Sequence, residues 1–402
     1  MSKKKRSLLD LFFGKSKKVT GEINRLQMIS SFNPVFTSLG TDIYQSKVAR
    51  QCIDRIATNI GKLVPKHIQT ISSDRVSYIN GDINAILNNP NPLMTTYDFL
   101  YKISSQLDTY NNAFVYINKD MEGMITGLYP ILATTCELFE NKRGEIFLQF
   151  TFITGKTYTL PYLDLIHLRK FYNGRDIFGS DNQVLLNDLV AADTASQGIN
   201  NAIRTSNNLR GIIKYSNAML SPEDQQKAKD TFVNDYLSLE NESGIASLDA
   251  KAEFLPIKMD PITLDKDQMD RINKNIFDYF GISEKIVNNS YSEEEWAAFY
   301  EGVIEPRAIQ FSQAFTSKIF SDRAIADGHK IEFTTNRIHY ASLATKIKMI
   351  DTLAPFGMIM IDEAREILDL PSLGGEAGQK ILQSLNNIDS SIANEYQSNK
   401  EG

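Results

Sequence analysis

The chain has few of the residues from which metal centres and nucleophilic active sites are built. Its 402 residues include only 2 cysteines and 4 histidines. None of these residues has a partner at the spacing of a metal motif, and no nucleophile and base can be paired from sequence. The sequence therefore predicts no catalytic residue, no metal site and no cofactor. Cys52 and Cys136 each lie in an apolar pattern, which predicts two buried thiols instead of a disulfide.

Long apolar runs are missing too. No stretch approaches the roughly 20 apolar residues that a membrane-spanning helix needs, so no membrane partner is expected. The short apolar run near the N-terminus is broken by Asp10 and flanked by basic residues on both sides, unlike a signal peptide. Residues 1–24 are expected to form a basic flexible arm. The formal net charge of −6 leaves the remaining chain acidic, which argues against an ordinary duplex-binding protein with a basic face.

The first half of the chain reads as an α+β unit. Apolar residues at helical spacing predict helices over Gln45–Val64, over Asp82–Leu87 and from a Thr95 cap to about Tyr110. Short β-type runs separated by turns follow between Ala113 and Leu168. His167 lies inside one of these runs, and we expect it to be a hydrogen-bonded structural histidine.

The second half is richer in helices. A long helix with small residues at its centre is followed by a strand, a polar helix, a second strand and another helix that Gly281 ends. These elements are predicted over Gln183–Ser206, Gly211–Tyr215, Ser221–Leu239, Ala252–Ile257 and Asp265–Phe280.

A polar loop and a long helix come next. Ser283–Tyr291 is expected to be a free loop, and the capping box that starts at Ser292 opens a helix to about Phe320. Pro306 predicts a kink in this helix of more than about 20°. A strand over Lys330–Phe333 and helices over Tyr340–Leu353 and Asp362–Leu368 follow, and the polar tail from Gly374 is expected to fray.

In the order and spacing of several segments, the chain resembles the portal proteins of tailed phages that are built like the HK97 portal. The similarity runs from about Val48 to Gly375. The segments that carry it are Val48–Ala57 with Leu63–Pro65, Leu87–Thr95 with Phe99, Leu165–Arg169, Gly174, Gly179–Ser180, Phe280–Ile282, Glu305–Pro306, Gly357 and Asp362–Arg365. The chain departs from this family at Asn111, Ser283 and Asp362, where glycine, proline and asparagine are usual.

The resemblance implies an α+β portal fold with a wing, a two-helix stem, a small α/β clip inserted between the stem helices, and a helical crown. The implied divisions are a wing over residues 25–182, a first stem helix over 183–209, a clip over 210–261, a second stem helix over 262–281, a tunnel loop over 282–291, a kinked helix and further wing over 292–338, and a crown with a polar tail over 339–402.

The resemblance also implies a function and partners. Twelve subunits would form a ring at one capsid vertex, through which double-stranded DNA passes without sequence specificity. The expected protein partners are the major capsid protein, scaffold, the terminase large subunit and a head-tail adaptor. The protein would be assembled in the host bacterial cytoplasm and would end in the virion. It would not be an enzyme.

Two groups of site residues follow from the implied divisions. The tunnel loop would present a lysine and short polar side chains to DNA, and the clip strands would dock partner proteins. The tunnel residues are Lys285, Asn288, Asn289 and Ser290. The clip residues are Gly211, Ile212, Ile213, Tyr215, Phe254 and Leu255.

Two other functions compete with the portal interpretation. Another head or tail structural protein, such as an adaptor, would need no paired long helices flanking a β insertion. A DNA-processing enzyme such as a nuclease would need carboxylates or histidines that converge on a metal. The three consecutive glutamates from Glu293 to Glu295 are better explained as the favourable first turn of a helix.

Overall fold

The computed structural model describes residues 27–32, 43–72, 75–174, 177–206, 211–215, 223, 226–227, 230, 252–256, 266–334, 343–368 and 370–383. These residues form two compact units. The first comprises Ile53–Ser180 with the described parts of Met1–Pro34 and Lys285–Gly402, and the second comprises the described parts of Val35–Cys52 and Asp181–Glu284. Within the described residues, no helix has the length and apolar character needed to cross a membrane.

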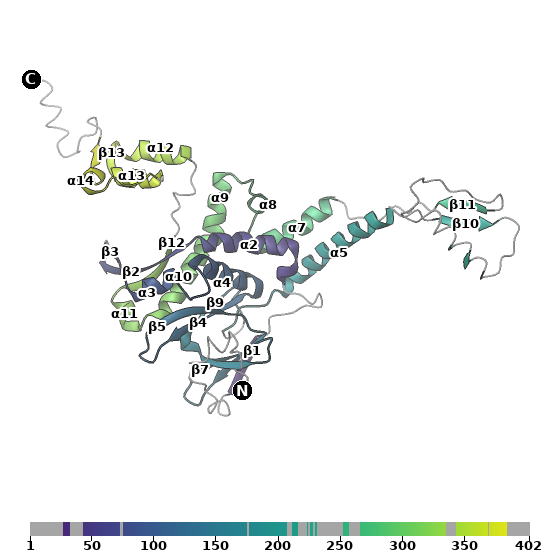
Figure 1. The fold of residues 1–402 in the computed structure, drawn as a ribbon, viewed down its shortest axis with the longest axis horizontal. Helices are drawn as coiled ribbons and strands as arrows, with labels where there is room; N and C mark the ends of the chain where they lie inside the picture. The colour runs from purple at the N-terminus through teal and green to yellow at the C-terminus, as the bar shows by residue number, and fades with distance from the viewer. Residues whose placement is uncertain are drawn as a thin grey trace, which may run out of the picture. The chain divides into compact units, whose positions relative to one another are not determined.

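Three larger antiparallel sheets organise the first unit, which also holds a two-stranded sheet near the C-terminus (Figure 1). One has the order β1-β6-β7-β8, the second β5-β4-β9, and the third β12-β2-β3. Their strands are β1 (Gln27–Phe32), β2 (Val64–Ser72), β3 (Arg75–Tyr78), β4 (Asn112–Lys119), β5 (Ile125–Ile131), β6 (Thr135–Glu140), β7 (Ile146–Thr151), β8 (Thr157–Pro161), β9 (Leu165–Arg169) and β12 (His329–Thr334). The expected α+β class is confirmed.

The first unit also contains helices: the part of α2 (Lys47–Gly61) from Ile53 onward, α3 (Asp82–Asn88), α4 (Thr96–Tyr110), α9 (Glu293–Phe299), α10 (Glu305–Ile319) and α11 (Asp322–Ala326). Helices α3, α4, α10 and α11 contact strands of the second and third of these sheets. Phe315 on α10 makes edge-to-face ring contacts with Phe99 on α4 and with Phe333 on β12. Helix α4 begins at the predicted cap, since the Thr95 hydroxyl accepts the backbone N–H of Asp98.

The predicted helix over Gln45–Val64 is too long at both ends. A short 3₁₀ turn over Ile43–Gln45 precedes α2, which ends at Gly61, and Val64 already belongs to β2. Pro65 lies inside β2 and pairs with Phe333, in a stretch that the neighbouring β3 does not reach. Its missing N–H therefore costs no hydrogen bond between strands. Strands tolerate proline at positions of this kind.

Pro306 lies directly after an unusual turn in the predicted long helix. Residues Tyr300–Ile304 form a π-helix between α9 and α10, and the backbone N–H of Glu305 bonds to the Tyr300 carbonyl. Proline cannot donate a hydrogen bond and crowds the turn before it, so a wider turn at this place relieves both problems. The predicted helix is thus present with an internal π-turn, and the size of its kink stays a prediction.

The second unit is built on two helices that pack against each other, α5 (Gln183–Ser206) and α7 (Lys266–Phe280) (Figure 1). Both match their predicted ranges to within a residue. Between them in the chain, β10 (Gly211–Tyr215) and β11 (Ala252–Pro256) form an antiparallel pair. The predicted polar helix over Ser221–Leu239 lies mostly outside the described residues.

The C-terminal part contains α12 (Leu343–Leu353), β13 (Phe356–Met360), α13 (Ile361–Ile367), α14 (Gly375–Gly378) and β14 (Ile381–Gln383). Strands β13 and β14 pair, so the expectation that the tail frays from Gly374 is wrong as far as Gln383. A carboxylate explains the local fold: Asp362 accepts hydrogen bonds from Ser372 Oγ at 2.6 Å and from the Leu373 and Gly374 amides. The basic arm and residues 384–402 lie outside the described residues.

Candidate functional site

The end of α7 is fixed by its backbone. Gly281 has φ 71°, in the left-handed region that glycine enters without steric cost. The Ile282 amide donates to the Phe277 carbonyl at 3.0 Å and the Gly281 amide to the Asp278 carbonyl at 3.1 Å. This pair of bonds is a Schellman motif. The predicted helix stop at Gly281 is therefore confirmed.

The segment that follows is partly helical. A free loop was expected over Ser283–Tyr291, but Glu284–Val287 form a helical turn, α8. The expectation of a loop fails here because Ile286 and Val287 are buried, which stabilises the turn. Asn289 takes the left-handed conformation with φ 56°, and the Ser290 amide donates to the Lys285 carbonyl at 2.9 Å. The sequence therefore supplies an asparagine where helices usually end on glycine.

Arg55 holds α8 in place. Its Nε donates to the Val287 carbonyl oxygen at 3.1 Å. Carbonyls in the last turn of a helix have no partner within the helix, so this guanidinium satisfies one of them. The segment is thus anchored by two buried side chains and by one arginine from α2.

Lys285 forms an ion pair with Glu295. The other carboxylate oxygen of Glu295 accepts the Ser292 amide at 2.9 Å and completes the predicted capping box of α9. Hydrogen bonds from Lys285 and then from Ser292 lower the pKa of Glu295. One carboxylate therefore ties α8 to the start of α9, and Lys285 is not the free cation that the sequence analysis assumed.

The remaining predicted tunnel residues face solvent in the described chain. Asn288, Asn289 and Ser290 are exposed. Tyr291 stacks on Trp296, with ring centroids 5.1 Å apart. The segment therefore presents uncharged polar groups between a buried turn and an aromatic stack. Their role toward DNA stays a prediction.

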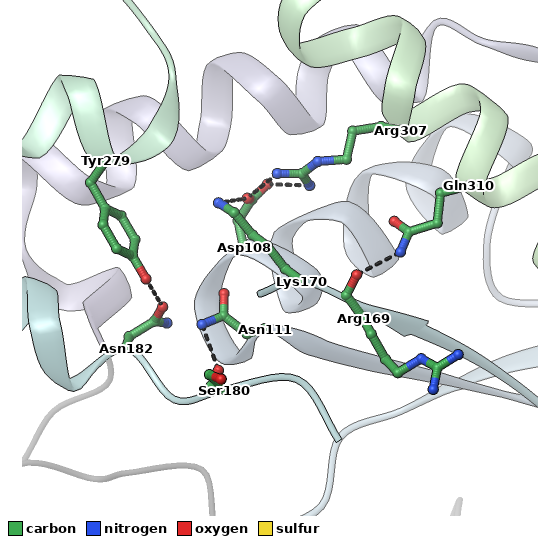
Figure 2. Close-up of polar contacts among 9 residues, drawn as sticks. All are labelled: Asp108, Asn111, Arg169, Lys170, Ser180, Asn182, Tyr279, Arg307 and Gln310. Atoms are coloured by element: carbon green, nitrogen blue, oxygen red, sulfur yellow. Dashed lines mark hydrogen bonds and ion pairs between the residues drawn. The ribbon is translucent and has the colours of Figure 1, made fainter. Parts of the chain in front are cut away.

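A buried carboxylate lies at the centre of a second site, which we call the polar junction and which Figure 2 shows. Asp108 on α4 has a fully buried side chain and receives Arg307 Nη2 at 2.6 Å and Lys170 Nζ at 3.1 Å. Burial alone would raise the pKa of Asp108, but the two cations outweigh it and the net shift is downward. The junction comprises Asp108, Asn111, Asn112, Arg169, Lys170, Gly179, Ser180, Arg307 and Gln310.

The junction fastens the chain just before α5 to the C-terminal end of α4. Asn111 Nδ2 donates to the Ser180 carbonyl at 2.8 Å, and Asn112 Oδ1 accepts the Gly179 amide at 2.8 Å. A Cβ on Gly179 would overlap the carbonyl oxygens of Lys170 and Asn111, so only glycine fits. Asn111 is left-handed with φ 55°. Asparagine tolerates this conformation better than most residues do, which accounts for Asn111 where the resemblance implied glycine.

Gln310 adds a further link, because its Nε2 donates to the Arg169 carbonyl at 2.5 Å (Figure 2). Sequence reasoning missed this junction. The one available signal was an aspartate beside the apolar stripe of α4, and its partners come from chain positions far away. In the second unit, the Tyr279 hydroxyl donates to Asn182 Oδ1 at 2.5 Å and joins α7 to the residue before α5.

His167 has the structural role that was expected. It is buried, with Nε2 3.0 Å from Asn112 Oδ1 and Nδ1 3.2 Å from the Tyr162 hydroxyl. The Asn112 oxygen can only accept, so Nε2 carries the proton and Nδ1 accepts from the tyrosine. Burial, helped by nearby Arg169, lowers the pKa of His167 well below its ordinary value. The ring is therefore neutral.

The predicted clip residues lie in β10 and β11. Gly211 pairs with Pro256, Ile212 with Leu255 and Ile213 with Phe254. Pro256 ends its strand, as proline requires. The pairing brings the two halves of the predicted clip site into one small sheet, and its partner docking stays a prediction.

Within the described residues, no group of three or more histidine, cysteine, aspartate or glutamate side chains could hold a metal ion. In the part of the chain that the structure describes, no cysteines form a disulfide: Cys52 and Cys136 are buried thiols, as expected. The described residues form structural features in place of a metal site. These are the α5–α7 helix pair, the small β10–β11 sheet and two anchored turns.

Comparison with known proteins gives the class first. The fold is similar to that of a chain from the neck of a native gene transfer agent particle computed with C12 symmetry, with a TM-score of 0.59 and 14% identity, over 86% of this chain and 96% of that chain. The neck of an empty particle, computed with C6 symmetry, matches with a TM-score of 0.59 and 15% identity, over 82% and 93% of the two chains.

Sequence comparison then gives the family. The profile of the phage portal protein family matches residues 47–369. A probable portal protein of Lactococcus phage p2 is 24% identical over 315 residues, which is 73% of this chain and 74% of the relative. The chain belongs to the phage portal protein family, which is a structural family.

Proposed function

We propose that this chain forms a closed ring, of twelve subunits, at a single vertex of a phage capsid, and that double-stranded DNA is packaged and ejected through the ring. The proposal rests on the architecture of the second unit. Two helices, α5 and α7, pack together and flank the β10–β11 sheet in sequence. In a portal protein these elements would be the two stem helices and the clip, with the crown at the C-terminal end.

Exposed apolar side chains on α5 support a ring. Val184 is 80% exposed, and Val190 and Ile199 are also exposed. All three are apolar residues of α5. A neighbouring copy would cover them. A head-to-tail contact that repeats by rotation closes into a ring. The relative with C12 symmetry supports twelve copies.

The segment after α7 would face the DNA. It offers Asn288, Asn289 and Ser290 as exposed neutral groups, while Glu295 neutralises Lys285. Affinity for DNA rises with the number of phosphates that lysines and arginines neutralise. A rim of short polar groups with paired charges would therefore guide the duplex without holding it.

The remaining partners follow from the same role. The β10–β11 sheet would dock the terminase large subunit and later a head-tail adaptor, and the first unit would contact the major capsid protein and scaffold. The protein would assemble in the host bacterial cytoplasm and remain in the virion. It would act without catalysis and without a cofactor.

Electron microscopy of the purified protein tests the ring directly. We expect closed rings with a central channel. A compact monomer at every protein and salt concentration would contradict the proposal, whereas a ring with another number of subunits would revise only the stoichiometry. A metal-dependent nuclease assay on the same sample tests the rival enzyme function, and DNA cleavage lost on chelation would support that rival.

A further inference from the structure

Two histidines from distant parts of the chain meet in the sheet with the order β12-β2-β3. His67 on β2 and His329 on β12 are 262 positions apart in sequence, and His67 Nε2 lies 2.9 Å from His329 Nδ1. Phe320, at the end of α10, contacts both rings, with its centroid 4.8 Å from that of His67 and 5.8 Å from that of His329. The two imidazoles are therefore packed together, and we call them the histidine pair.

The histidine pair lies beside a turn that is bound closely to β2. This α11–β12 turn consists of Asp327 and Gly328. The Thr70 amide donates to the Gly328 carbonyl at 2.9 Å, and Gln69 Nε2 donates to the Asp327 carbonyl at 3.0 Å. Gly328 has φ 87°, and a Cβ on it would overlap the Thr70 carbonyl oxygen. Because His329 follows this glycine directly, a movement of its ring away from β2 also pulls on the turn.

The short distance between the facing nitrogens limits how many protons the pair can hold. A hydrogen bond between them needs a proton on one nitrogen and a lone pair on the other. The neutral pair meets this requirement, and so does a pair in which one ring has taken up a proton at its outer nitrogen. With both rings protonated, two N–H groups and two positive charges face each other at 2.9 Å, and the bond is lost. The closed pair therefore accepts at most one extra proton, whereas two separated histidines accept two.

The surroundings of His67 disfavour its charged form. The residue is 6% exposed, and its Nδ1 has no hydrogen-bond partner among the described residues. Burial, and then the charge of His329, lower the pKa of His67. The closed arrangement therefore resists protonation more than an open one does.

The other titratable groups on the neighbouring elements are directed elsewhere. Side chains of a strand alternate between the two faces of a sheet, so the charged residues next to the pair on β2 and β12 lie on the opposite face; they are Lys66, Lys330 and Glu332. Tyr78 on β3 pairs with Ile68 and shares that opposite face. On α10, Lys318 donates to the Tyr162 carbonyl. The charged side chains of α3, of α11 and of the α11–β12 turn are exposed; they are Asp82, Asp322, Arg323 and Asp327.

We propose that the histidine pair is a pH-sensitive latch, which holds the α11–β12 turn on β2 near neutral pH and releases it when both rings become protonated. Strand β12 lies at the edge of its sheet, so the turn can move away without breaking a second strand pairing. The open arrangement holds one or two more protons than the closed one. Below the ordinary histidine pKa of 6.5, each additional proton therefore favours opening by up to about tenfold per pH unit. The latch does not depend on ring formation, so its failure and the failure of the proposed function are separate results.

Hydrogen exchange of the Thr70 amide in the purified protein measures the opening, because this amide donates to the turn. The reference is the Leu128 amide of another sheet, which donates to the Pro90 carbonyl at 2.7 Å. After correction for the intrinsic effect of pH, we expect a change from pH 7.5 to 5 to speed exchange at Thr70 at least about tenfold relative to Leu128. An unchanged ratio of the two rates would overturn the proposal.

Variants separate the latch from a general effect of charge. His329→Gln keeps an acceptor for His67 Nε2 and removes one of the two positive charges, so the acceleration at Thr70 should fall about tenfold at pH 5. His67→Gln makes the same test from β2. Lys330→Gln is the matched control, because it removes a positive charge from β12 on the opposite face and should leave the acceleration unchanged. Full acceleration in both histidine variants would show that other groups open the turn, and the latch would be wrong.

Discussion

Arg307 and Asp108 form a two-point contact across 199 residues of sequence, with Nη2 2.6 Å from Oδ1 and Nη1 3.1 Å from Oδ2. The aspartate is fully buried and Lys170 shares it. Pairing of this kind holds both side chains in one geometry. It fixes the start of α10 against the C-terminal end of α4. The stretch of chain that leads to α5 is held at the same end of α4.

Loss of the buried charge should therefore be costly. Asp108→Asn removes the buried negative charge that two largely buried cations share, and we expect a loss of about 3–5 kcal/mol in the free energy of unfolding. The matched control is Asp164→Asn, which breaks the half-exposed pair with Lys119 and should cost about 0–1 kcal/mol. Chemical denaturation of both variants measures the difference. Equal losses would contradict the role given to the junction.

The left-handed residue that follows α8 gives a second prediction. Asn289→Val places a β-branched residue at φ 56° and should destabilise the turn by about 1–2 kcal/mol. Asn289→Gly should leave it nearly unchanged. Hydrogen exchange at the Ser290 amide, which donates to Lys285, reports the turn directly. Faster exchange in the glycine variant as well would show that the asparagine side chain is needed.

The ion pair of α8 and α9 should control the charge that the channel presents to DNA. Glu295→Gln keeps a capping side chain but frees Lys285, so DNA should move more slowly through assembled particles. Replacing Lys285, Asn288 and Asn289 with alanine should leave rings intact and alter the packaging or retention of DNA in assembled particles. Lys142→Ala, in an exposed turn, is the control. Packaging and retention equal to wild type in both test variants would remove the segment from the mechanism.

Stability should fall on mild acidification. Burial lowers the pKa of His167 below its model-compound value of 6.5, so the unfolded chain binds a proton that the folded chain does not. The contribution of His167 to the free energy of unfolding is then fully present above pH 6.5. As the pH falls below that value, the contribution decreases by up to about 1.4 kcal/mol per pH unit. Unfolding between pH 7.5 and 5 measures the slope. His167→Gln should flatten it, and an unchanged slope would assign the effect to other groups.

Local signals predicted much of this fold. The caps at Thr95, Gly281 and Ser292 act within one turn of chain, and each ends or begins a helix where the sequence placed it. The divisions that the resemblance to portal proteins implied stay a prediction. Strand β2 was missed, although it pairs with the neighbouring β3 as well as with the distant β12.

The candidate sites were predicted less well for the same physical reason. Lys285 was assigned to the tunnel segment, but its pairing with Glu295 depends on how α8 folds. Arg307 could not be joined to Asp108 from spacing, since only the packing of α10 on the first unit brings them together.

The π-turn over Tyr300–Ile304 changes how this stretch of chain can vary in length. Phe299 and Ile304 are both buried although five positions separate them, and the next buried residue, Ala308, follows after four. The turn therefore absorbs one residue without moving either apolar face. Removing Gly302 would give the four-residue spacing of an ordinary helix, whereas a deletion within α10 would rotate every later side chain by about 100°. Insertions and deletions among related chains should gather at this turn.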